Sequence, residues 1–382
     1  MKKMTAIFLT LIMLLGLCAC GGRDPAGTAP NGGGTQQTGA GTDDTEPGGF
    51  EVTDLLGRAV TVPANASRFA CIGPGALRLY CYVADKAALV GVESAEVEWG
   101  SEGRPYAMSL DEISGMAVIG PGGPGNAPDA ELLFAAAPDV IFSMYNSEAA
   151  VSDELQEKTG IPVVTLSYGE AEVFDQCIYD SMALIGKVTG HEDRAEAVVG
   201  FMEDIERDLD SRTAEIADKP LVYMGCQSNR GSHGIESTVG NYVLFEALNI
   251  RNAAAEAGVP GYAMIDKEQV LEMDPDIIII DAGGYGILSD DYAANPEFYE
   301  ALSAVKSGRF YMQMPYNWYY TNLEIALADA YYIGAVVYPD AFSDVDIEQK
   351  FDEISDFMLG IPCYESIAGS YFGGFQQVKL GK

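Results

Sequence analysis

One short unit occurs twice in the chain: a glutamate, Glu131 or Glu268, precedes a Pro-Asp pair at the same spacing in both copies. An apolar run follows each pair at once, at 140–142 and at 277–280. Proline has no amide hydrogen to donate, so each unit is predicted to be a short amphipathic helix that ends at the proline, followed by a buried strand of a parallel sheet. Two such copies indicate two similar α/β lobes with a cleft between them.

The amino-terminal segment, residues 1–19, has the pattern of a secretory signal. Two lysines precede an apolar run that is too short to be a permanent membrane helix. The following residues resemble the lipobox of bacterial lipoproteins, in which cleavage before a cysteine leaves that cysteine to carry a lipid. Cys20 fits this pattern better than Cys18, because a small alanine precedes it. We therefore expect an extracytoplasmic protein anchored by lipid to the outer face of the membrane; an ordinary cleaved signal is the alternative.

Composition narrows the possible partners and metals. The chain has 22 basic and 57 acidic side chains and a formal charge of -35, which opposes binding to nucleic acid or anionic lipid. Beyond the signal, the odd number and wide spacing of five cysteines indicate that most of them are small buried residues rather than part of a disulfide framework or a thiolate metal site. They are Cys71, Cys81, Cys177, Cys226 and Cys363. Two histidines are too few for a multi-histidine site for free zinc or manganese, and no resident cofactor is expected.

The fold class predicted is α/β, with two doubly wound lobes joined by one long bridging helix and a ligand cleft between the lobes. A flexible, Gly/Thr-rich tether at 20–49 precedes an N-terminal lobe at 50–190, the bridging helix at 191–218, and a C-terminal lobe with a tail at 219–382. A hairpin is expected at 50–62, with strands at 68–72, 118–119, 140–143, 163–166, 221–225, 277–280 and 310–312. Helices are expected at 76–83, 148–158, 242–248, 266–273 and 323–338.

Taken in order, several of these motifs resemble one family: the substrate-binding proteins of ABC importers for iron-siderophore, haem and corrinoid complexes, which have a rigid single-helix hinge. The motifs are the opening 52–58, the strand and loop 71–76, the two repeated units, 159–162 and the bridging helix. The resemblance implies a monomeric binding protein, not an enzyme, that works with an ABC permease and its cytoplasmic ATPase. It also implies that a glutamate on each lobe docks onto permease arginines, which by position are Glu131 and Glu268. Both fall early in predicted helices, where the helix dipole favours a carboxylate.

Candidate ligand-binding residues lie in loops beyond the carboxyl ends of the predicted strands, where doubly wound lobes bind ligands. They are Arg78, Trp99, Arg104, Tyr145, Asn146, Arg230, His233, Tyr285, Tyr316, Asn317 and Trp318. Aromatic walls with a few arginines suit a bulky, anionic or oxygen-rich metal chelate such as a ferric siderophore.

Other ligands stay open at this point. His233 lies in a polar Gly/Ser loop and could be an axial metal ligand, as in some haem or corrinoid (cobalamin-type) binders that the chain resembles. The chain also resembles a branch of the family associated with molybdate or tungstate, and Arg78, Arg104 and Arg230 could serve a small oxyanion. The number of loop aromatics favours the larger ligand. A surface binding or signalling lipoprotein without a permease is a further alternative.

The sequence motifs give little support for an enzymatic function. Residues 120–125 match the glycine spacing of a dinucleotide-binding loop, but their prolines cannot offer amides to a pyrophosphate, and no acidic residue ends a following strand at the usual distance. A rigid loop at the rim of the cleft is the preferred interpretation. The nucleophile elbow of α/β hydrolases is absent from the sequence.

Overall fold

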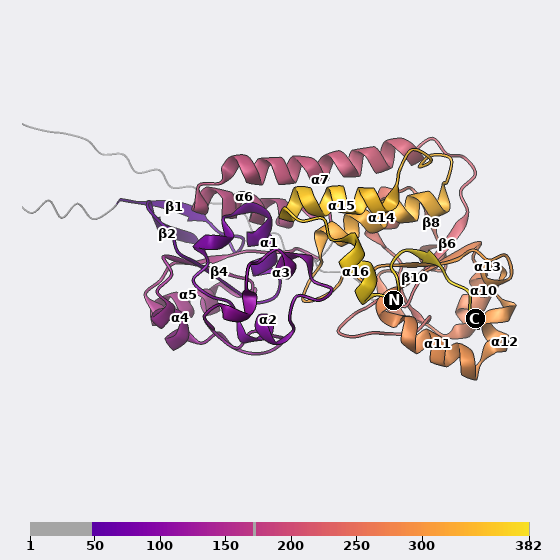
Figure 1. Ribbon diagram of the computed structural model, residues 1–382, viewed down its shortest axis with the longest axis horizontal. Helices are drawn as coiled ribbons and strands as arrows, with labels where there is room; N and C mark the ends of the chain where they lie inside the picture. The colour runs from indigo at the N-terminus through magenta and orange to yellow at the C-terminus, as the bar shows by residue number, and fades with distance from the viewer. Residues whose placement is uncertain (1–47, 171–172, 382) are drawn as a thin grey trace, which may run out of the picture. The chain divides into compact units, whose positions relative to one another are not determined.

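The computed structural model describes residues 48–170 and 173–381 (Figure 1). The predicted signal, Cys20 and nearly all of the predicted tether lie outside these residues. Within the described ranges, no helix combines the length and the apolar character that a membrane crossing requires.

The N-terminal lobe is built on a parallel sheet with the order β3-β4-β5. Isolated parallel bridges, Phe69 to Leu89 and Val92 to Val118, continue the pairing on the other side of β3, so the lobe is wound in both directions. The strand expected at 118–119 is only such a bridge. The elements are β1 (Gly49–Thr53), β2 (Ala59–Pro63), β3 (Phe69–Ile72), α1 (Ala76–Val83), η1 (Lys86–Ala88), α2 (Ser94–Glu98), α3 (Pro105–Met108), η2 (Ile113–Gly115), α4 (Ala130–Ala136), β4 (Val140–Ser143), α5 (Ala149–Thr159), β5 (Val163–Thr165) and α6 (Gln176–Thr189).

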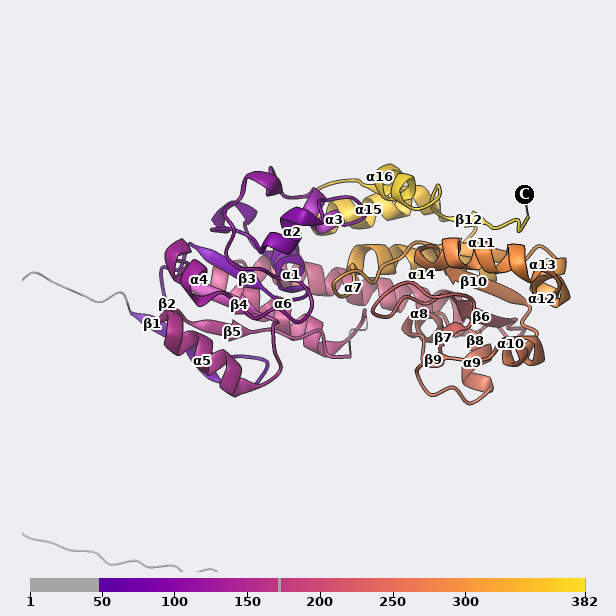
Figure 2. The same ribbon diagram turned by 90° about the horizontal axis from the view of Figure 1, so that it is seen from below.

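The C-terminal lobe has a five-stranded sheet with the order β12-β11-β10-β6-β8, in which β12 alone runs antiparallel (Figure 2). Strands β7 and β9 form a separate antiparallel pair. The elements are β6 (Leu221–Gly225), β7 (Ser237–Val239), α8 (Val243–Ala247), β8 (Arg251–Asn252), α9 (Ala253–Glu256), β9 (Tyr262–Met264), α10 (Lys267–Met273), β10 (Ile277–Asp281), η3 (Ala282–Gly284), α11 (Tyr285–Ala294), α12 (Pro296–Ala301), α13 (Ser303–Lys306), β11 (Phe310–Gln313), α14 (Leu323–Val337), α15 (Ile347–Leu359), α16 (Tyr364–Ser370) and β12 (Gln376–Gln377).

Both copies of the repeated unit fold as helix, Pro-Asp and strand. Helices α4 and α10 each end at a residue with left-handed backbone directly before the proline. The aspartate after the proline then binds the start of the neighbouring parallel strand. Asp139 accepts a hydrogen bond from the amide of Arg68 (3.0 Å), beside β3, and Asp276 accepts one from the amide of Leu221 (2.8 Å) in β6. The repeated aspartate therefore sets the register of equivalent strands in the two lobes.

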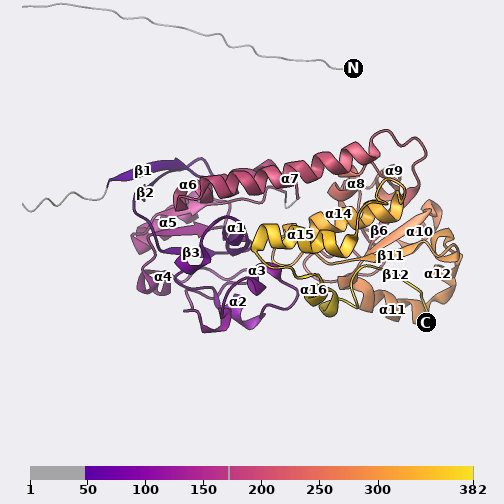
Figure 3. The ribbon, with the colours of Figure 1, turned by 45° about the horizontal axis from the view of Figure 1, so that its top comes forward.

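Two long helices connect the lobes. Helix α7 (Glu192–Thr213) corresponds to the predicted bridging helix and buries the apolar side chains of one face, and α15, which was not predicted, lies alongside it (Figure 1, Figure 3). Phe201 of α7 stacks on Phe357 of α15 with ring centroids 4.1 Å apart, and Arg194 donates to the carbonyl of Phe357 (2.6 Å). Helix α15 packs on α14 and also contacts α1 and α3 of the N-terminal lobe. One hydrophobic cluster accordingly holds core residues of both lobes.

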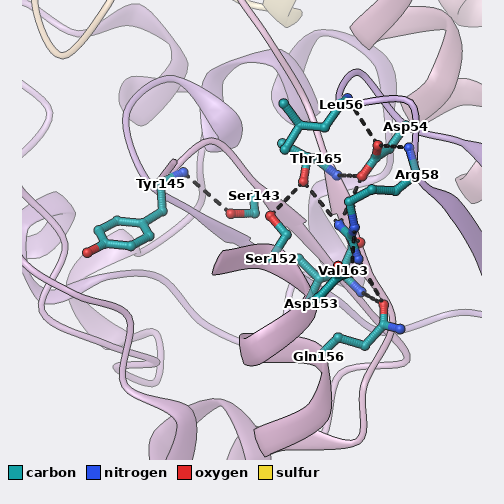
Figure 4. Close-up of polar contacts among 10 residues, drawn as sticks. All are labelled: Asp54, Leu56, Arg58, Ser143, Tyr145, Ser152, Asp153, Gln156, Val163 and Thr165. Atoms are coloured by element: carbon teal, nitrogen blue, oxygen red, sulfur yellow. Dashed lines mark hydrogen bonds and ion pairs between the residues drawn. The ribbon is translucent and has the colours of Figure 1, made fainter. Parts of the chain in front are cut away.

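The turn of the β1–β2 hairpin is anchored to the N-terminal sheet by a polar network (Figure 4). One carboxylate oxygen of Asp54 accepts hydrogen bonds from the amides of Leu56 (3.0 Å) and Arg58 (2.9 Å). The other accepts from the Arg58 guanidinium (3.0 Å) and from the amide of Thr165 (3.2 Å) at the end of β5. Arg58 also pairs with Asp153 of α5 (2.8 Å). The opening motif is thus a structural clamp.

Replacing Asp54 by alanine is expected to lower the free energy of unfolding by about 3 kcal/mol, because a buried guanidinium and several amides lose their acceptor. Urea unfolding followed by circular dichroism measures this loss. Asp153→Ala is the matched control: it removes the exposed partner of the same Arg58, with a side chain 64% exposed, and should cost less than about 1 kcal/mol. Equal losses in the two variants would contradict the clamp.

Candidate functional site

A loop of the C-terminal lobe, residues 315–322, crosses to the N-terminal lobe and is held there by Arg78. The guanidinium of Arg78, fully buried on α1, donates to the carbonyls of Trp318 (2.5 Å) and Tyr319 (3.1 Å). It also donates to Oδ1 of Asn322 (3.0 Å) and lies 4.6 Å from the ring centroid of Tyr106. Arg78 therefore links the two lobes in this structure.

Aromatic side chains of the same loop strengthen this link. Tyr319 meets Trp99 edge-on, with centroids 4.9 Å apart, and its hydroxyl accepts a hydrogen bond from the amide of Gly123 (2.9 Å). Tyr320 stacks on Tyr168 at 5.1 Å. Both loop tyrosines have left-handed backbone, φ 52° and 70°, which costs roughly 1 kcal/mol or more for each residue. The contacts with the N-terminal lobe hold this strained conformation.

Arg104 is also buried and bound to protein groups. It forms an ion pair with Glu96, donates to the hydroxyl of Tyr106 (2.9 Å) and donates to the carbonyl of Glu96 (2.8 Å). Each guanidinium nitrogen of Arg78 and both terminal nitrogens of Arg104 thus donate to acceptors within the protein, whereas the buried Nε of Arg104 has no hydrogen-bond partner among the described residues. A contact between either of them and a ligand stays a prediction.

The loop after β6 carries two further predicted residues. Arg230 is exposed and has left-handed backbone, φ 53°. His233 is half-buried, with Nε2 2.8 Å from the carbonyl oxygen of Asn229. Asn317, from the loop after β11, donates to the carbonyl of Ser228 (3.1 Å). The structure therefore brings the predicted loops after β6 and β11 together.

The other predicted residues lie in separate places. Trp318 is 40% exposed, and Tyr285, at the start of α11, packs edge-on against Phe372 at 4.9 Å. Tyr145 and Asn146 line a cavity of about 300 Å³ within the N-terminal lobe, between α4 and α5. Figure 4 shows that the ring of Tyr145 points away from the hairpin clamp. The structure does not gather all predicted residues into one site.

A pocket of about 360 Å³ lies between the lobes. Glu170 and Val173 line it from the N-terminal lobe. The C-terminal lobe contributes Val239, Asn241, Tyr242, Val243, Gly261, Tyr262 and Tyr316. Among these described lining residues, Tyr316 is the one that the sequence predicted. Tyr242 was missed as a pocket residue although the helix at 242–248 was predicted, because it lies before the helix and not in a loop after a predicted strand. Tyr262 was missed because it lies in β9, a strand of three residues that is too short to show a period.

Two buried carboxyl groups lie at the carboxyl edge of the C-terminal sheet. Asp281 ends β10 and accepts a hydrogen bond from the amide of Gly283 (2.7 Å). Asp329 of α14 accepts one from the amide of Met314 (3.1 Å). Burial raises the pKa of Asp281 to about 6 and raises the pKa of Asp329 well above its usual value. Asp281 thus changes charge near neutral pH.

Asp281 is expected to make stability depend on pH. Its pKa is raised on folding, from about 4 to about 6, so the folded chain binds more protons between these values. The stabilising contribution is fully present below about pH 4 and is lost as the pH rises through 6, a change of roughly 3 kcal/mol. Compared with the wild type, Asp281→Asn should therefore gain stability from pH 4 to pH 7. Urea unfolding of both proteins across this range measures the difference; a pH-independent difference would contradict the expectation.

Glu131 and Glu268 occupy equivalent positions, each the second residue of its helix, and both side chains are exposed. Asp129 caps α4 by accepting from the amide of Glu131 (3.0 Å), and Asp266 caps α10 in a capping box. Phe134, on α4, is 67% exposed. The fold thus presents these two exposed acids at equivalent positions of the two lobes, while docking to a permease stays a prediction.

Thiols and metals give no further site. All five cysteines of the described part are free; Cys177 is half-buried and the others are buried, as the sequence predicts. Burial raises the pKa of Cys81 and of Cys363 to about 12. In residues 48–170 and 173–381, no three or more His, Cys, Asp or Glu side chains are grouped so that they could hold a metal ion.

The family profile described as "Periplasmic binding protein" matches residues 81–315, more than half of the chain. The chain belongs to the periplasmic binding protein family. Among its relatives, the molybdate-binding protein MolA of Haemophilus influenzae is 22% identical over 324 residues, covering 79% of this chain and 88% of MolA. The Fe(3+)-citrate-binding protein YfmC of Bacillus subtilis is 24% identical over 189 residues, covering 50% and 58% of the two chains.

A crystal structure in this family has the same fold. It is a periplasmic solute binding protein from Veillonella parvula, 21% identical, covering 85% of this chain and 97% of that one with a TM-score of 0.65. The fold of two α/β lobes with a long connecting helix is thereby confirmed. The protein is a solute-binding component of ABC transport and not an enzyme. The loop 120–125, which has the glycine spacing of a dinucleotide site, instead joins the interlobe contact through Gly123.

Proposed function

We propose that this periplasmic binding protein captures a metal chelate of the ferric siderophore type and delivers it to an ABC permease with its cytoplasmic ATPase. The observation that supports this proposal is the pocket between the lobes, with three tyrosines and three valines on its walls. A volume of about 360 Å³ with mostly apolar and aromatic walls suits an organic ligand. A lipid anchor at Cys20, on the outer face of the membrane, belongs to the same proposal.

The similarity to MolA favours a second candidate ligand, molybdate or a related oxyanion. A small oxyanion requires a compact site of hydrogen-bond donors. Arg78 and Arg104 could have supplied such donors, but the guanidinium of Arg78 and the terminal nitrogens of Arg104 bind carbonyl, carboxylate and hydroxyl oxygens of the protein, which leaves only the buried Nε of Arg104 without a partner among the described residues. The chelate is therefore the preferred ligand.

Ligand capture is expected to move the lobes by only a few degrees, because α7, α15 and a shared hydrophobic core connect them. The change that a permease would detect is the spacing between Glu131 and Glu268. Small-angle X-ray scattering with and without ligand measures the motion. A large compaction on binding would contradict the rigid connection.

Native mass spectrometry with metal analysis tests the proposed ligand. The full chain, purified in mild detergent, is incubated separately with ferric siderophores, ferric citrate, haem, cobalamin and molybdate. Retention of a ferric chelate with its iron is the expected result. Retention of molybdate alone would replace the proposal by the oxyanion candidate, and retention of haem or cobalamin would change the class of chelate.

A further inference from the structure

The pocket between the lobes is acidic at its rim. Glu170 is the charged side chain among its described lining residues, which are otherwise tyrosine, valine, asparagine and glycine. Its backbone amide donates to the carboxylate of Asp175 (3.1 Å), so a second acid lies beside it. Neither carboxylate forms an ion pair within the described residues. A ligand entering the pocket therefore meets uncompensated negative charge.

Acids continue along the adjoining surface. A hollow that shares Val243 with the pocket is lined by Glu206, Asp210 and Glu246. The cation in this hollow, Arg207, is paired with an aspartate on its own helix. The negative potential thus extends beyond the mouth of the pocket.

Two more carboxyl groups lie behind the pocket wall. Burial raises the pKa of Tyr316, which lines the pocket, and the nearby carboxyls of Asp329 and Asp281 raise it further. Both acids are fully buried and have no basic partner in the described part of the chain. Asp329, with its pKa raised well above the usual value, is uncharged at neutral pH, whereas Asp281, with a pKa of about 6, is mostly ionised there. Asp281 therefore adds negative charge behind the wall, of the same sign as the acids at the rim.

The cations of the predicted site do not offset these acids. The guanidinium nitrogens of Arg78 and the terminal nitrogens of Arg104 donate to oxygens of the protein, and Arg104, whose buried Nε has no partner among the described residues, does not line the pocket. Arg230 is exposed on the loop after β6 and is not among the described residues that line the pocket. An anion in the pocket would thus approach several carboxyl groups without a free basic side chain on the pocket wall.

We infer that the ligand of this pocket is a neutral or positively charged metal chelate and that the site selects against anionic chelates of the same size. The inference rests on the proposed function and narrows its ligand class. One exposed carboxylate within a few ångströms of a ligand charge changes affinity by about threefold to tenfold, and several acids act together.

A series of one chelate with three charges tests the inference. The ferric complex of a linear trihydroxamate is prepared with a free terminal amine, with that amine acetylated and with it succinylated, so that the complex is cationic, neutral or anionic. Quenching of tryptophan fluorescence in the full chain gives the three affinities. The cationic and neutral forms are expected to bind at least about tenfold more tightly than the anionic form, with a gap that narrows at high salt.

The outcomes separate the inference from the proposed function. Equal or tighter binding of the anionic form would overturn the inference and leave the chelate function intact. Binding of none of the three forms, with molybdate retained instead, would overturn the proposed function and the inference with it.

A charge reversal assigns the selectivity to the pocket. Glu170→Lys is expected to lower the ratio of cation to anion affinity by about fivefold or more. Glu300→Lys, on the exposed face of α12 and outside the pocket lining, changes the net charge equally and should leave the ratio unchanged. Both affinities come from the same sample, so a partly unfolded variant does not alter their ratio. An unchanged ratio in Glu170→Lys would overturn the inference.

Discussion

Exchanging Glu131 and Glu268 together for glutamine is expected to reduce ligand uptake by at least about thirtyfold and to leave ligand affinity unchanged. Both side chains are exposed at equivalent helix positions, away from the pocket between the lobes. Removing one partner of a close charge pair at an interface costs about 2 kcal/mol or more, and two pairs would be lost. Uptake into vesicles that contain the cognate permease and ATPase measures the effect.

A matched control separates docking from a general loss of charge. Glu157 on α5 and Glu300 on α12 are also exposed, one on each lobe, and their double exchange for glutamine changes the net charge by the same amount. This control should retain nearly full uptake. If the Glu131→Gln, Glu268→Gln variant transported normally, or if it lost ligand affinity instead, the docking role would be wrong.

Replacing Arg78 by methionine is expected to lower the free energy of unfolding by about 3 kcal/mol or more. Methionine keeps much of the side-chain volume, but two carbonyls and the side chain of Asn322 lose a buried donor. The tyrosines of the loop, with their left-handed backbone, would also lose the contact that holds them. Urea unfolding measures the loss of stability.

Fluorescence supplies an independent measurement for the same variant. The chain has two tryptophans, and both lie at this interlobe contact: Trp318 in the loop and Trp99 against Tyr319. Arg78→Met should therefore shift tryptophan emission before global unfolding. Arg207→Ala is the control, because Arg207 is 71% exposed and its ion pair should contribute less than about 1 kcal/mol. Similar stabilities of the two variants would argue against an interlobe role for Arg78.

Several elements could be predicted from local sequence because their signals are strong and short-ranged. Helix α1, strands β4 and β6, and the ends of α5 at Glu148 and Gly160 lie where turn residues and apolar runs place them. Helix α15 was not assigned, although it is long. Its importance comes from packing between α7 and both lobes, which no local pattern contains.

The ligand site was much less predictable. The prediction placed the ligand in loops beyond strand ends, and of its residues Tyr316 lines the interlobe pocket. Burial decides which side chains in such loops remain free to bind. In the sequence, Arg78 and Arg104 cannot be distinguished from arginines that bind a ligand. In the structure, each has protein acceptors close to its guanidinium. Tyr242 and Tyr262 line the interlobe pocket because of how short elements pack, and nothing in their flanking residues distinguishes them from core tyrosines.

The sequence by itself determined the duplication: two helix, Pro-Asp, strand units require two parallel sheets, since proline and the β-branched runs act locally. It also determined the equivalent positions of Glu131 and Glu268, because each lies at the same distance before its Pro-Asp pair and so takes the same place in its helix. Only the tertiary structure decided that the loop 315–322 spans the lobes and that the interlobe pocket is acidic. Both depend on contacts between residues far apart in the chain, such as Arg78 with Asn322, and on which charges those contacts neutralise.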